Sequence, residues 1–224
     1  MENLSTKKTT RLRMLIALAL LSAIAFASTA LLRIPIVMFL KYDPKDIVIA
    51  IAGFIYGPLP ALAMTVVVSL IECFTVSDTG FWGLLMNIIA TASLVLPASI
   101  IYKKHRTIGG AVIGLTLGSV LAVVMMLLWN LLVTPIYLGY PRSAVVALLL
   151  PVFLPFNLLK CSLNSILTVL LYKPISATLR ASHLLDKKGD DSAPKSGKAI
   201  IPAVAGVLLV LVITATVLYS ILSK

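Results

Sequence analysis

Charge is scarce in this sequence. Of its 224 residues, 12% are Asp, Glu, Lys or Arg and 60% are hydrophobic. A soluble domain typically carries about 25% charged and about 45–50% apolar residues. A water-facing fold of this size has no place for so much apolar surface, so the composition excludes an ordinary soluble domain. It predicts an all-α membrane protein, because a helix satisfies its own backbone groups in lipid.

Cysteine and histidine are also scarce, with two of each. Cys73 and Cys161 lie in apolar contexts without a CxxC spacing, which indicates small buried hydrophobes. His105 and His183 lie in segments between apolar runs. The sequence holds no HExxH, GxSxG, P-loop or paired-carboxylate arrangement, and these are the patterns that carry familiar chemistries. We therefore expect no metal, no cofactor and no enzymatic activity.

Positive charge outnumbers negative charge, with 19 Lys and Arg against 8 Asp and Glu. Such an excess can indicate nucleic-acid binding, but here the basic residues stand at the ends of apolar runs. This pattern is typical of the signals that orient a membrane protein. The charge therefore predicts a lipid environment and no nucleic-acid partner.

Uncharged runs predict the membrane spans, since a helix needs about 20 mostly apolar residues to cross the hydrocarbon core. The predicted helices are 14–32, 46–56, 59–74, 81–102, one within 107–140, one within 148–172, and a seventh at 199–222. The second and third are separate because Gly57, Pro58 and Pro60 should end one helix and start another. The resulting domains are a six-span membrane domain (1–178), a polar cytoplasmic linker (179–198) and an additional C-terminal transmembrane helix (199–224).

The distribution of basic residues tests this division of the chain. With the N-terminus in the cytoplasm, most Lys and Arg fall in the predicted inside segments, including the cluster at 103–106. That cluster would fall outside if 47–71 were a single span, so the positive-inside rule favours the broken pair. The seventh span then places the C-terminus outside the cell.

The sixth predicted span carries three polar residues on one face. Asn157, Lys160 and Asn164 fall within a narrow arc at 100° per residue. A lysine inside a span costs about 2.5–3.5 kcal/mol on insertion scales, which favours a functional site. The alternative is a lysine whose ammonium reaches back to the interface, but Lys160 lies about 18 Å along the helix from the predicted inner end.

Other polar residues fall near the outer ends of the predicted spans. For Glu72, Asn87 and Asn130 taken singly, a helix–helix hydrogen bond is the commoner explanation. Together with Lys160 they suggest one polar cluster, with a salt bridge between Glu72 and Lys160 as one arrangement. In the outer loops, Asp43 is suited to cap the helix that follows. The segment 75–83 is rich in hydroxyl groups and exposed backbone, so it serves either as a ligand contact or as a simple connector.

Two helices show small residues at four-residue spacing, the pattern that allows close helix approach in lipid. In the first span these are Ala19, Ala23 and Ala27, for which docking to a partner subunit and packing inside the bundle remain equally open. In the fifth span they are glycines at 110, 114 and 118, for which internal packing is favoured.

Several segments resemble a known family. They are LKYDPKD at 40–46, GFIYGP at 53–58, the stretch from Glu72 through SDTG at 77–80 and Gly83 to Asn87, and NLLK at 157–160. Over about residues 10–175 the chain is similar to the riboflavin-specific substrate-binding (S) component of energy-coupling factor (ECF) transporters. The seventh span departs from the six-helix pattern of that family.

The resemblance implies a prokaryotic plasma-membrane protein that captures riboflavin with high affinity near its outer face, without chemistry of its own. The implied partners are a transmembrane coupling subunit, which the alanines of the first helix would face, and two cytoplasmic ATPase subunits. It implies flavin hydrogen bonds from Asn130, Asn157 and Lys160, contacts from the 79–85 backbone, and a gating loop at 42–43. With the polar cluster, the candidate substrate-binding residues are Tyr42, Asp43, Glu72, Thr79, Gly80, Leu84, Asn87, Asn130, Asn157, Lys160 and Asn164.

Other functions remain open at this point. The chain is also consistent with an S component for a different vitamin or small molecule, or with a facilitator that acts alone. An intramembrane enzyme would need a nucleophile–base pair or metal ligands, which the sequence does not show. An assembly scaffold would not need a lysine inside a span.

Overall fold

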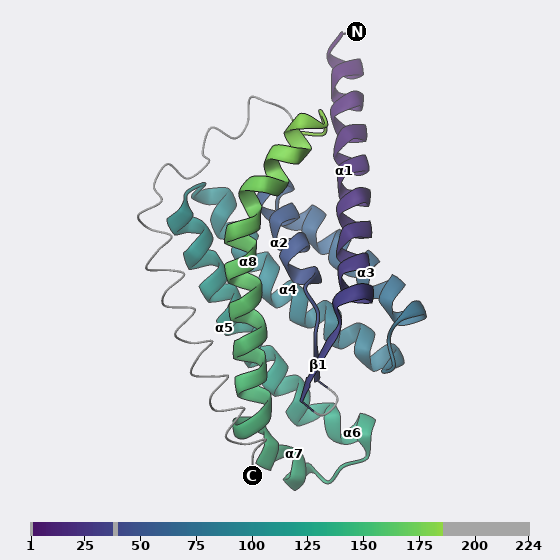
Figure 1. Ribbon diagram of the computed structural model, residues 1–224, viewed down its shortest axis with the longest axis vertical. Coiled ribbons are helices and arrows are strands. Elements are labelled where there is room, and N and C mark those ends of the chain that lie inside the picture. The colour runs from purple at the N-terminus through teal and green to yellow at the C-terminus, as the bar shows by residue number, and fades with distance from the viewer. Residues whose placement is uncertain (1, 38–39, 186–224) are drawn as a thin grey trace.

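Apolar helices form the body of the protein in the computed structural model, which describes residues 2–37 and 40–185, without the side chains of 2–8 and 37 (Figure 1). The predicted seventh span, 199–222, lies outside these residues, as does most of the predicted linker. The helices are α1 (Glu2–Leu32), α2 (Lys45–Tyr56), α3 (Pro58–Thr75), α4 (Gly80–Lys104), α5 (Ile108–Leu132), α6 (Thr134–Leu138), α7 (Arg142–Leu148) and α8 (Leu154–Ala181). A π-helical turn, η1 (Leu149–Phe153), joins α7 to α8.

Five segments of the described chain are long and apolar enough to cross a membrane. They are Thr9–Leu32, Pro58–Thr75, Gly80–Lys104, Ile108–Leu132 and Arg142–Ala181. The sixth core helix, α2, has only 12 residues, about 18 Å of rise. Ten of those residues are buried, so α2 is enclosed by the other helices. The prediction of an all-α membrane fold is confirmed.

The break between α2 and α3 lies where the sequence predicts it. Gly57 has φ 96°, a conformation that glycine adopts without steric cost. Pro58 opens α3, where its missing N–H costs no helical hydrogen bond. The chain thus reverses within one residue, and this sets the direction of every later helix.

One end of the bundle carries a β-hairpin where the sequence predicts only a loop. Strand β1 (Ile34–Val37) pairs antiparallel with β2 (Leu40–Tyr42), with Ile34 opposite Tyr42. Strands this short leave too little alternation to recognise in a sequence. We call this end, which also holds α6 and α7, the hairpin end (Figure 1). The other is the amino-terminal end, where α1 projects beyond the remaining helices.

The sixth predicted span differs in its boundaries from the structure, whereas the fifth agrees. Helix α5 lies inside the predicted range 107–140 and stops at Leu132, because Pro135 has no N–H to continue the helical ladder. Around the start of α8, Pro151 and Pro155 lack N–H donors, and the N–H of Leu154 bonds the Leu149 carbonyl in the wider π-type turn. Helix α8 then continues to Ala181, well past the predicted end at 172.

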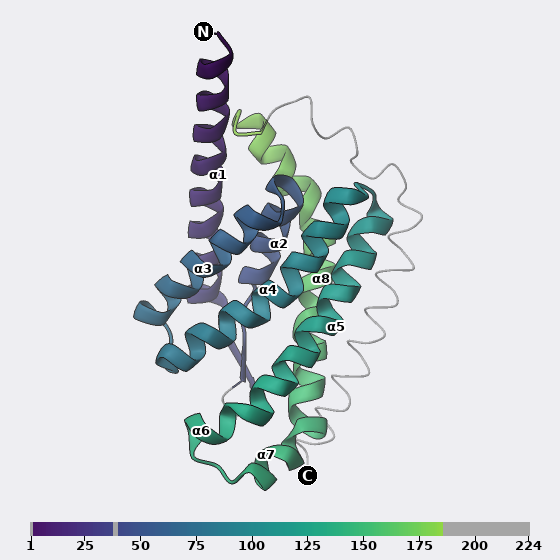
Figure 2. The ribbon, with the colours of Figure 1, turned by 180° about the vertical axis from the view of Figure 1, so that it is seen from behind.

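Close backbone packing joins α4 and α5, which lie side by side (Figure 2). A Cβ added to Gly118 would lie 2.2 Å from the carbonyl oxygen of Leu94, and one added to Gly114 would lie 2.9 Å from that of Ala98. The glycine spacing in α5 therefore serves internal packing, as the sequence favours.

The small residues of α1 divide between two faces. Ala17, Leu21 and Ala25 are 0–2% exposed and face the bundle. The predicted docking alanines, at 19, 23 and 27, are all exposed on the outer side of the helix. Packing inside the described bundle therefore does not account for their four-residue spacing.

Candidate functional site

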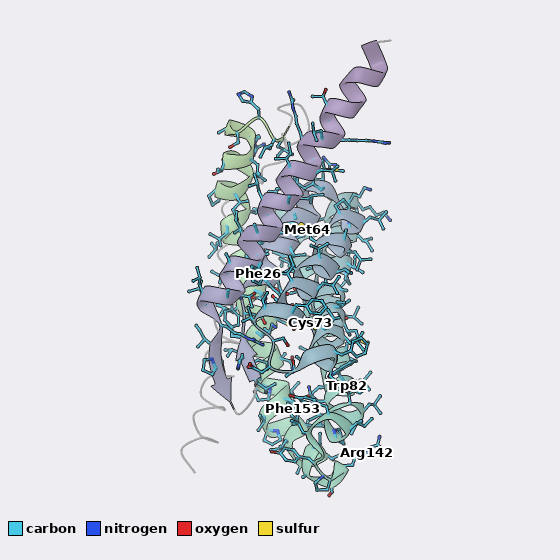
Figure 3. The ribbon with its side chains drawn as sticks, turned by 90° about the vertical axis from the view of Figure 1, so that its right-hand side faces the viewer. Phe26, Met64, Cys73, Trp82, Arg142 and Phe153 are labelled. Atoms are coloured by element: carbon cyan, nitrogen blue, oxygen red, sulfur yellow. The ribbon has the colours of Figure 1, made fainter. Side chains whose placement is uncertain are left out.

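A pocket opens between the hairpin, α4, α5 and α8 in the hairpin half of the molecule. Figure 3 shows Trp82, which lines it, on the same half as Arg142 and far from Met64. Apolar groups form much of the wall, including Met86, Leu94, Met126, Trp129 and Phe156. The polar lining consists of Arg33, Lys41, Asp43, Asp46, Thr79, Asn87, Asn130, Thr134, Tyr137, Asn157 and Lys160. Apolar walls with a few convergent polar groups are typical of a small-molecule site.

Four consecutive residues, 43–46, run from the end of the hairpin into the first turn of α2 and organise the polar side of this pocket. Three of them, Asp43, Lys45 and Asp46, are charged and yet at most 5% exposed. Pro44 precedes the first residue of α2, where its fixed φ is compatible with a helix start. The stretch therefore places three charges inside the bundle just as the enclosed helix begins.

Lys160 meets two of these charges. Its Nζ lies 3.2 Å from Asp43 Oδ1 and 3.9 Å from Asp46 Oδ2, and its side chain is 14% exposed. Burial alone would raise the pKa of Asp43, but the Lys160 and Lys45 ammonium groups outweigh this and hold that pKa below its ordinary value. Lys160 also lines the pocket. Its carboxylate partners therefore hold the ammonium group in a position where a ligand can contact it.

Asp46 is held by neutral donors as well. Thr91 Oγ1 of α4 donates to Asp46 Oδ1 over 2.6 Å, and Asn164 Nδ2 of α8 donates to Asp46 Oδ2 over 3.1 Å. The Tyr42 hydroxyl donates to Asn164 Oδ1 over 2.8 Å. Asn164 thus links the hairpin to α2 from behind the pocket, which explains why a fully buried side chain is polar at that position.

Lys45 forms a second pair on the other side of α2. Its Nζ contacts Glu72 Oε2 of α3, and Asn87 Nδ2 donates to the same oxygen over 3.1 Å. The salt bridge between Glu72 and Lys160, which the sequence leaves open as one arrangement, is not the one that forms. Asp43 and Asp46 lie nearer to Lys160, whereas Lys45 points to α3. A buried ammonium paired with a carboxylate avoids most of the cost of an isolated charge.

Two further contacts join the hairpin to the loop between α3 and α4. Arg33 donates to the backbone oxygen of Val76 over 2.7 Å, and Lys41 Nζ lies 2.5 Å from Asp78 Oδ2. The hydrogen bond from Lys41, together with its charge, lowers the pKa of Asp78. Because both basic residues line the pocket, these contacts close its rim.

The same loop turns tightly into α4. The Thr79 hydroxyl lies 3.0 Å from that of Ser77, and a Cβ on Gly83 would lie only 1.8 Å from Thr79 Oγ1. Gly83 therefore leaves the space in which Thr79 folds back along α4. This places Thr79 at the pocket while Gly80, at φ 53°, turns outward.

Two asparagines line the pocket from the neighbouring helices α5 and α8. Asn130 Nδ2 donates to the Met126 carbonyl, and Asn157 Nδ2 donates to that of Phe153, each over 2.7 Å. The Asn130 side-chain oxygen also accepts from Thr134. Since these bonds stay within single segments of chain, either amide can exchange a local bond for a ligand without breaking a contact between helices.

The structure divides the predicted substrate-binding residues into three groups. The first lines the pocket: Asp43, Thr79, Asn87, Asn130, Asn157 and Lys160. The second, Tyr42, Glu72 and Asn164, supports those residues from behind. The third, Gly80 and Leu84, is not in the lining.

Four charged residues of the site are missed by sequence reasoning, namely Arg33, Lys41, Lys45 and Asp46. In the sequence they look like topology signals or parts of a solvated loop. One signal is available for two of them. Lys45 and Asp46 directly precede a run of uncharged residues that begins at Ile47 and has no polar face, and such a helix must be surrounded on all sides. Its first turn is therefore buried with it.

Within the part of the chain that the structure describes, no group of three or more His, Cys, Asp or Glu side chains is placed to hold a metal ion. The arrangement of the pocket instead combines hydrogen-bond donors and acceptors with aromatic walls. It is suited to hold a planar, polar-edged small molecule by contact alone.

Comparisons with known proteins agree with this geometry. A family model described as "ECF transporter, substrate-specific component" matches residues 13–172. The riboflavin transporter RibU of Staphylococcus aureus (strain TCH60) is 28% identical over 176 residues, covering 74% of this chain and 92% of that protein. The riboflavin transporter FmnP of Bacillus subtilis (strain 168) is 26% identical over 189 residues, covering 78% and 99%.

The fold has a solved counterpart. A structure of the S component of a bacterial ECF transporter superposes with a TM-score of 0.64 at 28% sequence identity. The match covers 76% of this chain and 99% of that one. The helices of the described bundle therefore have the arrangement of a membrane-embedded transport component.

Proposed function

The chain belongs to the family of ECF transporter substrate-specific components, and from this premise we propose that it is a high-affinity riboflavin-binding subunit of a vitamin uptake transporter. It captures riboflavin in the pocket at the hairpin end and delivers it with an ATPase-driven energy-coupling module. Both relatives are riboflavin transporters by name, which supports the choice of ligand. Riboflavin is the transported substrate here, and the protein performs no chemistry on it.

The single observation that carries the proposal is the position of Lys160. Its ammonium is paired with Asp43 and Asp46 and also lines the pocket. A flavin presents carbonyl oxygens and ring nitrogens along one edge of an apolar tricycle. Lys160, Asn157 and Asn130 supply the donors for that edge, and Trp82 and Trp129 supply aromatic walls for the ring faces.

The hairpin has to move for a ligand of this size to enter. The cavity measures about 90 Å³, and pockets for drug-sized ligands usually occupy about 300–1,000 Å³. The contacts of Arg33 and Lys41 with the α3–α4 loop are the ones that close the rim. We assign gating to the hairpin and to Tyr42 and Asp43 at its end.

The module that supplies energy comprises a transmembrane coupling subunit and two cytoplasmic ATPase subunits. The exposed alanines of α1, at 19, 23 and 27, form the docking face for the coupling subunit. Their small side chains let a second helix approach closely in lipid, where there is no hydrophobic drive for association. Leu20 and Ile24, which are 50% and 53% exposed, flank this face and add apolar contact area.

The amino-terminal end faces the cytoplasm in this proposal, because the basic cluster at 103–106 lies at that end with the start of α1. The chain then comprises the six-span domain of residues 1–178, a cytoplasmic linker at 179–198 and a further transmembrane helix at 199–224. The C-terminus follows that helix on the outer side of a prokaryotic plasma membrane.

Purification of the full chain tests the ligand directly. The protein should carry riboflavin, identified by mass spectrometry of the released small molecule, and bind it with nanomolar affinity by quenching of flavin fluorescence. A different bound molecule, or no flavin binding by protein that remains monomeric and helical, would refute the assignment. Uptake into vesicles should require the energy module. Uptake without it would identify a facilitator instead.

Two variants test the site. Lys160→Ala should weaken riboflavin binding at least about tenfold, since a charge-assisted hydrogen bond is worth about 1.5–3 kcal/mol. Because this change also leaves two carboxylates without their ammonium, Asn157→Leu provides a second test in which only a bond within α8 and η1 is lost. Lys104→Ala, at the other end, is the control. Unchanged affinity in both site variants would remove these residues from the site.

A further inference from the structure

A second cavity lies at the amino-terminal end, whereas the pocket described above lies in the hairpin half. Its volume is about 250 Å³, and residues from α1, α2, α4, α8 and the α4–α5 loop contribute to it. Its lining consists of Thr10, Arg13, Met14, Phe54, Ile55, Tyr56, Tyr102, Arg106, Tyr172, Leu184 and Leu185. The riboflavin proposal gives no role to this cavity.

The floor of the cavity is a packed aromatic cluster. The rings of Phe54 and Tyr102 stack with centroids 4.4 Å apart, and Tyr172 meets them edge-on at 6.0 and 5.7 Å. Aromatic side chains of this kind are enriched where a membrane meets water. Leu184 and Leu185, which follow α8, line another side. The cavity therefore has an apolar inner surface, close to the end of the span Gly80–Lys104 that contributes Tyr102.

The rim of the cavity is basic. Arg13 and Arg106 both line it from exposed positions, and Lys103 lies close by, since a Cβ on Gly57 would be 3.9 Å from its Nζ. No Asp or Glu is part of the lining formed by the described residues. The Tyr56 hydroxyl is buried and has no hydrogen-bond partner among the described residues. These groups bring two guanidinium side chains and a phenol to one cavity, and a guanidinium has five N–H donors with which to bind an oxyanion.

We propose that this cavity binds the phosphate headgroup of an anionic phospholipid of the adjacent leaflet. Arginine is the residue best suited to bidentate contact with phosphate, and basic pockets between helices on the cytoplasmic side are typical sites for such headgroups. The volume accommodates a headgroup and not a whole lipid, so the acyl chains would extend along the apolar outer surface of the bundle. A free phosphate offers the same chemistry without those chains, so the experiment separates the two.

Native mass spectrometry of the full-length protein in detergent provides the test. In separate experiments the protein is titrated with palmitoyl-oleoyl phosphatidylglycerol, with phosphatidylcholine that has the same acyl chains, and with inorganic phosphate. Phosphatidylglycerol should bind with the highest affinity. The Arg13→Gln/Arg106→Gln double variant should weaken its binding about twenty-five-fold, because each basic residue near an anionic surface contributes about fivefold. Tyr56→Phe should weaken it severalfold.

The Lys104→Gln/Lys173→Gln variant is the matched control. It removes the same amount of charge from exposed residues that do not line the cavity, so its phosphatidylglycerol binding should change by no more than about twofold. Equal loss in both double variants, or equal binding of phosphatidylcholine, would overturn the proposal. Inorganic phosphate binding as tightly as the lipid would reassign the cavity to a free anion.

Two further readouts separate loss of lipid binding from misfolding and from loss of a protein contact. Riboflavin affinity should be the same in the Arg13→Gln/Arg106→Gln variant as in the parent protein, which shows that the bundle is folded. Assembly with the energy-coupling module is measured in parallel. A variant that loses module assembly but binds phosphatidylglycerol normally would identify the cavity as a protein contact and contradict the lipid assignment. The riboflavin proposal does not depend on either result.

Discussion

In the hairpin half of the bundle, buried side chains of opposite charge meet from α2, α3 and α8, and neutral amides and hydroxyls complete the contacts. In the other half, up to its border with the pocket, α4 and α5 instead approach so closely that a Cβ at position 114 or 118 would collide with the α4 backbone. Paired charges can exchange partners when a ligand supplies an alternative, whereas contact between backbones permits no such exchange. The comparison indicates a rigid half that supports a half able to rearrange.

The buried pair of Lys45 and Glu72 offers the strongest test of the hairpin half. Lys45→Ala should destabilise the protein by about 3–5 kcal/mol, because it leaves the Glu72 carboxylate buried without its ammonium. Thermal unfolding in detergent measures the effect. Replacing both partners, as Lys45→Met with Glu72→Leu, should restore most of the stability. A loss below about 1 kcal/mol in the single variant would show that this pair does not hold the half together.

The glycine contacts test the rigid half. Gly118→Ala should cost about 1–3 kcal/mol, because its Cβ would lie 2.2 Å from a backbone oxygen of α4 that cannot rotate away. Gly109→Ala is the matched control in the same helix. The nearest atom to its Cβ is 3.8 Å away, so this change should be neutral or slightly stabilising. Equal effects at both positions would contradict the role of close approach.

A pair of tyrosines compares the two halves directly. Tyr42→Phe should cost about 1 kcal/mol, since it leaves the buried Asn164 oxygen without the hydroxyl that donates to it. Tyr56→Phe should leave stability unchanged in lipid-free detergent, because the Tyr56 hydroxyl has no hydrogen-bond partner among the described residues. Chemical unfolding of both variants provides the measurement. A larger loss for Tyr56→Phe would reverse the comparison.

Loss of the contact between Lys41 and Asp78 should have the smallest effect of these changes. It should alter the rate of riboflavin dissociation more than the stability of the protein. Asp78→Asn should speed riboflavin dissociation severalfold by loosening the rim, with little change in the unfolding temperature. The carboxyl pKa is lowered by Lys41, so the contact persists above the ordinary pKa of about 3.9 and is lost as pH falls through the lowered value. Stopped-flow dissociation at pH about 7 and about 5 should therefore agree. Acceleration at the lower pH would contradict this.

Much of the fold could be predicted because long uncharged runs leave helices as the only solution in lipid. The reversal at Gly57 and Pro58 is also predictable, since each residue acts locally on the backbone: glycine permits a positive φ, and proline fixes its own φ and lacks an N–H. The hairpin could not be predicted because two strands of three or four residues depend on pairing, not on local pattern. The end of α8 could not be predicted because Pro174 looks like a terminus in sequence, yet it lies inside the helix.

The site was predictable only in part, for a related reason. Lys160 is recognisable alone, because an ammonium in an apolar helix is costly wherever it lies. Its partners are not, since Asp43 and Asp46 stand in a stretch of mixed charge that resembles any solvated turn. Which carboxylate meets which ammonium depends on how α2 is enclosed by α3, α4 and α8, and periodicity carries no such information.

The enclosure of α2 also bears on how the protein is made. Asp46 bonds Asn164, a residue 118 positions later in the chain, so α2 emerges from the ribosome long before α8 can meet it. A 12-residue helix that begins with two charges is too short to settle across the bilayer by itself. We therefore expect α2 to be held by the insertion machinery, or near the membrane surface, until α8 has been synthesised. The packing of α2, the second helix in chain order, would then be the last step of assembly.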